Sequence, residues 1–164
     1  PYKKLSNFVL GFAGVLQTIP SIALLTFMIP FFGIGFKPAI FGLFIYSLLP
    51  ILQNTHVAMS SIDPRLITAA RGIGLYPHEV LLSVKLPLAF PTLLAGIRTA
   101  TILSIGTATL AAFIGAGGLG EPIVTGLALN DSSIVLQGAV PAAALAIVMD
   151  GLFSLINLKF AKEM

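Results

Sequence analysis

Four long stretches with almost no charge set what this chain can fold into. The first two, 5–36 and 38–62, contain no charged residue, and the next two, 86–120 and 132–158, contain one each. About 20 apolar residues cross the hydrocarbon core of a bilayer as a helix, so each stretch is long enough to span a membrane once. We therefore predict four spans, at roughly 8–32, 38–60, 88–112 and 133–158.

The scarcity of charge also identifies the solvent of the folded chain. Only 9% of the 164 residues are charged, whereas soluble domains carry about a quarter. The apolar residues do not alternate as membrane β-strands require. We expect an all-α, polytopic transmembrane bundle whose surrounding partner is the lipid bilayer. The nine Lys and Arg residues are scattered, so the basic pI does not indicate a nucleic-acid partner.

The basic residues orient the predicted spans. With the N-terminus in the cytoplasm, Lys37 is the only basic residue outside and Arg98 lies within a span. The cytoplasmic side then receives the other seven: Lys3, Lys4, Arg65, Arg71, Lys85, Lys159 and Lys162. Because Lys and Arg concentrate on the cytoplasmic side of membrane proteins, both termini of this multi-pass protein are predicted to be cytoplasmic.

Prolines inside the spans indicate local breaks. Pro20 and Pro141 each lack an amide hydrogen within an apolar stretch, and Gln17 and Thr18 directly precede Pro20. Such breaks are tolerated where a neighbouring helix or a water-filled cavity satisfies the freed backbone groups. Gln17 and Thr18 are therefore candidates for a pathway wall, with an ordinary helix–helix contact as the alternative.

A second polar group lies near the inner end of the second span. Gln53, Asn54 and His56 follow one another closely, and they are candidate pathway residues, with capping or interfacial packing as the alternative. His56 and His78 are isolated, and their spacing gives no metal site. No catalytic Ser–His–acid group can be assembled.

Two charges stand alone inside apolar spans. Arg98 lies eleven residues after Pro87, and Asp150 lies nine residues before Lys159. At 1.5 Å per residue both are roughly 15 Å from the inner boundary. Because buried charges in membranes usually pair, we predict an Arg98–Asp150 ion pair, as a static bridge in preference to a gating device.

Residues 63–87 differ from the rest of the chain because they form its longest polar loop. Asp63 can cap a helix that accepts Pro64 in its first turn, and Gly72 or Gly74 can end that helix. A second short helix is predicted from about Pro77, with Val80, Leu81 and Val84 on one face. Two short amphipathic helices suit docking into a groove of a partner protein. An interfacial pair lying on the lipid is the alternative.

This loop resembles the cytoplasmic "EAA" loop of ABC importer permeases of the type I fold, in which Glu-Ala-Ala is followed by a glycine and an Ile-x-Leu-Pro segment. The first position departs from the pattern, since it holds Thr and not Glu, which puts a charge contact in doubt. The resemblance implies ATPase-coupling roles for Thr68, Ala69, Ala70, Gly74, Val84, Leu86 and Pro87.

The resemblance extends over essentially the whole chain. The segments 17–25 and 95–123 and the Ala-rich last span are similar to the osmoprotectant branch, which imports glycine betaine, carnitine and choline, and to the related ergothioneine importers. The resemblance implies one permease domain over 1–164, located in the bacterial inner membrane, and an N-terminal helix preceding Tyr2. Implied partners are two ABC ATPase subunits, a second permease copy, and an extracytoplasmic solute-binding protein or fused binding domain. A permease for methionine, another amino acid or a phosphonate is the alternative solute class, and an ATP-independent transporter or channel is the more distant one.

The sequence contains one pattern that is typical of nucleotide binding and lacks another. Gly115, Gly117 and Gly120 satisfy G-x-G-x-x-G, but an apolar span precedes them and the next acid, Asp131, is only eleven residues on. A dinucleotide site requires a strand, a turn, a helix and an acid about 20 residues away, so a tight outer turn or re-entrant bend is expected. The sequence has no Walker motif. We expect this chain to be non-catalytic and to bind no cofactor, with ATP and Mg²⁺ on the partner ATPases.

Overall fold

The computed structural model describes the backbone of residues 2–163 and the side chains of residues 6–160. The side chains of Lys3, Lys4 and Lys162, which contributed to the predicted orientation, lie outside the described ones. Residues 2–163 contain helices and turns and no strand. In order, the helices are α1 (Tyr2–Thr18), α2 (Ser21–Phe32), α3 (Phe36–Ser60), α4 (Pro64–Gly72), α5 (Pro77–Glu79), a π-helix (Val80–Lys85), α6 (Leu86–Leu110), a 3-10 turn (Ala111–Ile114), α7 (Gly120–Leu129) and α8 (Ser132–Glu163).

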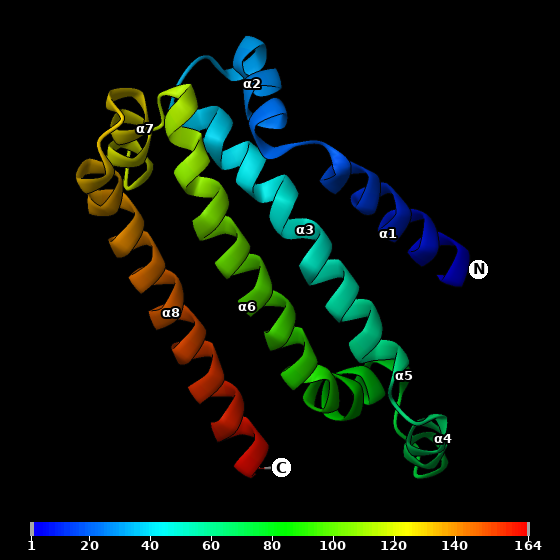
Figure 1. Cartoon of the computed structure of the whole chain (residues 1–164). Coiled ribbons are helices and arrows are strands. Elements are labelled where there is room, and N and C mark those ends of the chain that lie inside the picture. Colours follow the sequence, from blue (N-terminus) through cyan, green and yellow to red (C-terminus); the bar gives the residue numbers. More distant parts are fainter. Residues whose placement is uncertain (1, 164) are drawn as a thin grey trace.

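Three long helices form the body of the molecule. α6 packs against α3 on one side and against α8 on the other (Figure 1). α1 and α2 pack against α3, while α7 packs against α8 at the end opposite α4. The three helical segments 36–60, 77–114 and 132–160 are long and apolar enough to cross a membrane, and the α1–α2 pair makes a fourth if it is counted as one broken span.

The first predicted span is not one continuous helix. α1 and α2 meet at an angle of 95° around Pro20, so the predicted break at this proline is present, and it divides the predicted span 8–32 into two helices. Pro20 has no amide hydrogen and disfavours helical geometry at the residue before it. α2 restarts when the amide of Leu24 donates to the carbonyl of Pro20, at 3.0 Å.

The end of α6 makes the predicted tight turn. A 3-10 turn over Ala111–Ile114 leads into a segment in which Gly115, Gly117 and Gly118 all have positive φ. α7 then follows and reverses into α8 at Asn130, which is also left-handed at φ 53°. The Gly-rich run therefore forms a loop between membrane helices, with neither the strand nor the long helix of a dinucleotide site.

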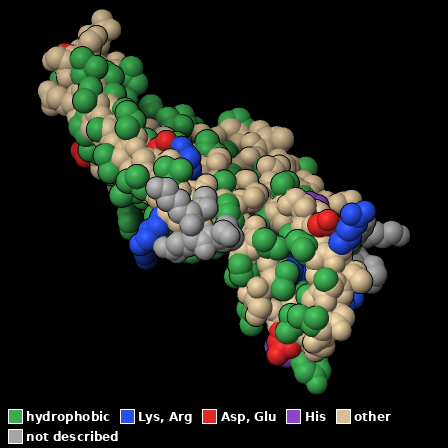
Figure 2. Space-filling model, turned by 90° about the horizontal axis from the view of Figure 1, so that it is seen from below, with side chains coloured by type: hydrophobic (Ala, Val, Ile, Leu, Met, Phe, Trp, Pro, Cys, Tyr) green, Lys and Arg blue, Asp and Glu red, His purple; other side chains and the backbone are tan. Residues whose placement is uncertain are grey.

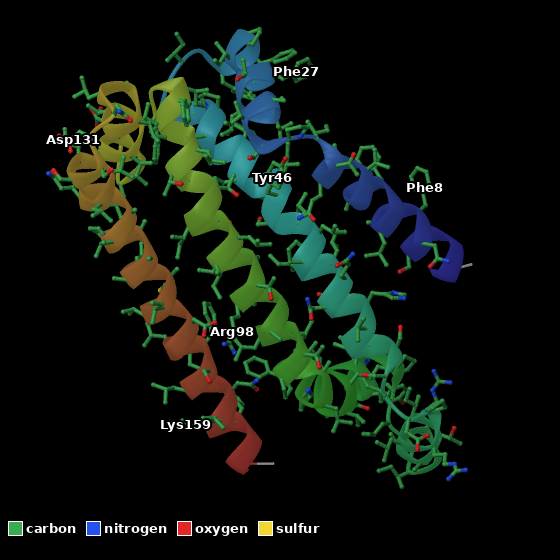
Figure 3. The ribbon with its side chains drawn as sticks, in the orientation of Figure 1. Phe8, Phe27, Tyr46, Arg98, Asp131 and Lys159 are labelled. Atoms are coloured by element: carbon green, nitrogen blue, oxygen red, sulfur yellow. The ribbon has the colours of Figure 1, made fainter. Side chains whose placement is uncertain are left out.

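Apart from Arg98 and Asp150, the charged side chains of the described residues lie near the two ends of the bundle. Lys37 begins α3 and Asp131 precedes α8 at one end, whereas α4 and Lys159 lie at the other (Figure 3). Seen from the α4 end, hydrophobic side chains cover much of the surface, and charged groups occupy a few places (Figure 2). This distribution agrees with a bundle whose long sides face lipid.

Candidate functional site

A side chain of α3 makes a hydrogen bond at the break between α1 and α2. The hydroxyl of Tyr46 donates a hydrogen bond to the carbonyl oxygen of Ile19, just before Pro20. Gln17 Nε2 donates to the backbone oxygen of Tyr46 at 2.9 Å, and the Thr18 hydroxyl donates to the carbonyl of Val15 at 2.7 Å. The carbonyls of Val15 and Ile19 beside the break thus gain side-chain donors, as membrane-embedded backbone requires. Figure 3 shows Tyr46 on α3 beside this junction.

A cavity of about 330 Å³ opens at the break. Polar and apolar side chains from four helices line it: Gln17, Thr18, Ile19, Pro20, Ser21, Tyr46, Leu103 and Thr107. None of these lining residues is charged, so the cavity presents hydroxyls, an amide and an aromatic ring. A site of this kind can contact a small solute at several points without holding a bare ion strongly.

Exposed polar residues continue from this cavity toward the α4 end. Gln53 lies seven residues after Tyr46 on α3, and Thr99 lies four residues before Leu103 on α6, so each pair shares one face of its helix. Both Gln53 and Thr99 are exposed. Three predicted pathway residues, Gln17, Thr18 and Gln53, therefore lie on or beside one polar surface.

Asn54 and His56 take other positions. Asn54 Nδ2 donates to the carbonyl of Pro50 within α3 at 2.8 Å, and its side chain is pressed against Gly96 of α6. His56 Nδ1 lies 2.7 Å from the Ser6 hydroxyl of α1. Asn54 therefore packs between α3 and α6, whereas His56 contacts α1 and also lines a separate open cavity of about 380 Å³ between α1 and α3. Their role in the pathway stays a prediction.

Arg98 and Asp150 meet as a bidentate pair. Arg98 Nε and Nη2 each lie 2.6 Å from a carboxylate oxygen of Asp150, so the predicted contact between α6 and α8 is present. Their side chains remain 36% and 40% exposed in the single chain. Because a charge that faces hydrocarbon is costly, this ion pair requires water or another protein surface beside it.

The 63–87 loop begins as the sequence predicts. The Asp63 carboxylate caps α4 by accepting from the amide of Arg65 at 2.8 Å, and Pro64 occupies the first turn. α4 ends at Gly72, and Gly74 adopts a φ of +92°, which makes the turn. The amide of Tyr76 then donates to Glu79 Oε2 at 2.7 Å and stabilises the start of α5.

The second half of the loop differs from the predicted separate helix. α5 has only three residues and runs directly into a π-helix, in which the amide of Leu86 donates to the carbonyl of Leu81. This wider turn leads into α6 at Pro87, which has no amide to donate. Val80 is buried and Val84 half-buried, but Leu81 is exposed, so the prediction of one face shared by all three is wrong.

α4 is anchored to two long helices. Ile67 on α4 packs against a buried cluster formed by Ala58 and Ile62 at the end of α3 and Ala89 at the start of α6. α4 thus contacts the cluster at the ends of α3 and α6 through Ile67, and it also packs against the π-helix.

The opposite side of the loop has no partner among the described residues. Ile73 and Tyr76 are 81% and 67% exposed, and Arg65 and Arg71 are exposed as well. Of the predicted coupling residues, Thr68, Ala69, Gly74, Leu86 and Pro87 are exposed, Val84 is half-buried and Ala70 is buried. Their coupling role stays a prediction, which an exposed apolar surface rimmed by charge supports.

Sequence reasoning missed several cavity residues. Tyr46, Ser21, Leu103 and Thr107 were not identified as site residues, although Tyr46 shares a helical face with Gln53, seven positions away, which was a usable signal.

A separate cavity of about 240 Å³ lies between α3, α6 and α8 near the Gly115 turn, and its lining is mostly apolar or glycine. No cluster of three potential metal ligands occurs within the described part of the chain.

A protein family matches this chain almost from end to end. The family described as "Binding-protein-dependent transport system inner membrane component" matches residues 1–162. The chain is similar to the choline transport system permease protein OpuBB of Bacillus subtilis, with 49% identity over 148 residues, which is 90% of this chain and 68% of that protein. It is also similar to the carnitine transport permease protein OpuCB of Listeria monocytogenes, with 45% identity over 96% of this chain and 71% of that protein.

Two further comparisons extend this set. The osmoprotectant import permease protein OsmW of Salmonella typhimurium is 47% identical over 92% of this chain and 73% of that protein. Among solved structures, a chain of the inward-facing MetNI methionine ABC transporter superposes with a TM-score of 0.84 at 26% identity, covering 97% of this chain and 77% of that chain. The fold is thus that of a type I ABC importer permease, as the sequence predicts.

Proposed function

The chain belongs to the family of binding-protein-dependent transport system inner membrane components, and we propose that it forms the translocation pathway of an ATP-driven importer for a quaternary ammonium solute. The candidate solutes are choline, carnitine and glycine betaine. The observation that carries this proposal is the anchoring of α4 to α3 and α6 through Ile67, Ala58 and Ala89, since it joins an exposed docking surface to the helices that line the polar cavity.

The solute class rests on the relatives. The permeases that share 45–49% identity with the chain are named for choline, carnitine and osmoprotectant import. The methionine transporter shares 26% identity, which supports the shared fold and makes methionine the second candidate solute. The higher identity favours the quaternary ammonium compounds. An ATP-independent transporter or channel is disfavoured by the family itself, whose name specifies dependence on a binding protein.

Coupling proceeds through the 63–87 loop. A separate ATPase subunit binds ATP and Mg²⁺ and grips the exposed side of α4, including Leu66 and Ile73. When the ATPases close, α4 moves with them and displaces the attached ends of α3 and α6. The Tyr46 cavity lies between these same helices, so its access changes from one side of the membrane to the other.

The complete transporter contains further subunits. A second permease copy, identical or related, encloses the pathway with this one, and two ATPases bind the two loops. A solute-binding protein outside delivers the solute and supplies most of the selectivity. The exposed Arg98–Asp150 ion pair supports contact with protein or water on that side of α6 and α8, because lipid solvates such a pair poorly.

Reconstitution tests the proposal. The chain is purified with its ATPase and binding protein, inserted in liposomes, and supplied with ATP and labelled choline, carnitine, glycine betaine or methionine. We expect ATP-dependent uptake of at least one quaternary ammonium compound, together with solute-stimulated ATP hydrolysis. Uptake of methionine alone would move the assignment to the second candidate, and uptake without ATP would contradict the mechanism.

A further inference from the structure

The cavity at the α1–α2 break is built by residues far apart in the sequence. It lies where α1 ends, α2 begins, and α3 and α6 pass alongside. Tyr46 is fixed at this place twice, because its hydroxyl donates to Ile19 and its carbonyl accepts from Gln17. The first bond restrains the ring and the second restrains the backbone that carries it, so the ring loses little freedom when it contacts a ligand, which favours binding.

The side chains that line the cavity favour one kind of solute group. The cavity offers the ring of Tyr46, the hydroxyls of Ser21 and Thr107, and the apolar side chains of Ile19 and Leu103. A primary ammonium or a metal ion is bound most strongly by a carboxylate, and no carboxylate lines the cavity. A quaternary ammonium has no N–H to satisfy, and its methyl groups pack against apolar carbon while its charge is attracted to an aromatic face.

We propose that this cavity is a transient binding site for the quaternary ammonium group of the transported solute, with the ring of Tyr46 as the principal contact. The inference rests on the proposed function and adds to it a position in the pathway. A single ring without a carboxylate binds weakly. Weak binding suits a pathway, since a solute must enter a site and also leave it.

A cysteine-protection experiment on the assembled transporter tests the site. The chain contains no cysteine, so Thr107→Cys introduces one thiol into the cavity. The thiol is modified with a methanethiosulfonate that carries a trimethylammonium group, and the reaction on this chain is followed by mass spectrometry. We expect choline to slow the modification several-fold, and its neutral carbon isostere 3,3-dimethylbutanol to have little effect.

Matched variants localise the effect. Thr99→Cys lies on the same side of α6, two turns from Thr107 and outside the cavity, and choline should not protect it. In the Thr107→Cys background, Tyr46→Leu should abolish protection, whereas Tyr46→Phe, which keeps the ring, should retain it. Phe44→Leu removes an exposed aromatic ring from another face of α3 and should leave protection intact.

The possible outcomes test the proposed binding site and the proposed function separately. Equal protection by choline and its neutral isostere, or equal protection of Thr99→Cys, overturns the site. So does an absence of protection in a complex that still imports choline, and in that case the proposed function stands. If Tyr46→Leu does not assemble, the comparison of choline with its isostere in Tyr46→Phe decides the same question. A complex that imports no quaternary ammonium compound overturns the proposed function itself.

Discussion

Arg98 on α6 and Asp150 on α8 form a bidentate ion pair across 52 residues of sequence, with both N–O distances at 2.6 Å. The pair joins two helices that otherwise meet through apolar packing. Since each charge is the only one in its stretch, neither has an alternative partner on its own helix at that depth.

Removing one charge of this pair should harm the protein more than removing both. Arg98→Gln and Asp150→Asn each leave the other charge without its partner. We expect each single variant to lower the yield of membrane-inserted protein several-fold and to reduce its melting temperature. The double variant should recover much of the loss. A double-mutant cycle measures the coupling, with Lys37→Gln as a control, and purely additive losses would show that the contact is not maintained in the membrane.

A side chain at Gly74 should uncouple transport. Gly74 has a φ of +92°, and a β-branched residue there should cost about 1–3 kcal/mol and distort the turn after α4. For Gly74→Val we expect normal membrane insertion and loss of most uptake. The control is Gly72→Ala, which lies in helical geometry with open space around an added Cβ. Unchanged uptake in Gly74→Val would contradict the coupling role of the loop.

The close approach of α3 and α6 should not tolerate a larger residue at Gly96. A Cβ at this position would lie 2.7 Å from Asn54 Cβ and 3.1 Å from the carbonyl oxygen of Pro50. We expect Gly96→Ala to destabilise the protein by about 1–3 kcal/mol through overpacking. Gly106→Ala on the same helix meets no atom within 4 Å and should be neutral or slightly stabilising. Denaturation in detergent compares the two, and equal stabilities would mean that the helices separate readily.

Acid should weaken the start of α8. Asp131 accepts a hydrogen bond from the amide of Ser133 at 2.8 Å, and this bond holds the pKa of its carboxyl below the ordinary value of 3.8. The lowered pKa stabilises the fold above that ordinary value, and the contribution is lost as the pH falls through it and through the folded pKa. Asp131→Asn keeps a capping side chain that does not titrate. We expect the variant to lose part of the acid sensitivity of thermal unfolding, and identical pH profiles would refute the assignment.

The two ends of the bundle should face opposite compartments. Ser83→Cys lies in the 63–87 loop and Asn130→Cys lies between α7 and α8. In a chain without native cysteine, a membrane-impermeant maleimide applied to intact cells should label Asn130→Cys and leave Ser83→Cys unmodified. Permeabilised cells serve as the control, in which both should react. Labelling of Ser83→Cys from outside would invert the orientation and detach the loop from any ATPase.

Much of the candidate site follows from local sequence signals. The Asp63 cap, the start of α4 at Pro64 and the turn at Gly74 were predictable because capping and left-handed geometry depend on the residues at those positions. The Arg98–Asp150 contact was predictable because a helix rises by a constant amount per residue, so depth in the membrane can be counted from the sequence.

Other features depended on residues distant in sequence. Pro20 predicts a break, but the local sequence does not reveal that Tyr46 of α3 donates a hydrogen bond to the carbonyl of Ile19 at the 95° bend. Asn54 and His56 were candidates on the same grounds as Gln17, and the structure places Asn54 against Gly96 and His56 beside Ser6 in a different cavity. Which way a polar side chain points is decided by the rotation of its helix against its neighbours, and one sequence window does not contain that information.

The sequence by itself determined that this chain is a helical membrane protein whose longest polar loop is 63–87, because transfer of an apolar segment into lipid is a property of the segment alone. Only the tertiary structure decided that Gln17, Tyr46 and Thr107 share one cavity while Asn54 and His56 do not. The physical reason is that these positions depend on how α1, α2, α3 and α6 bend and pack, and the partners that fix the bend lie on different helices.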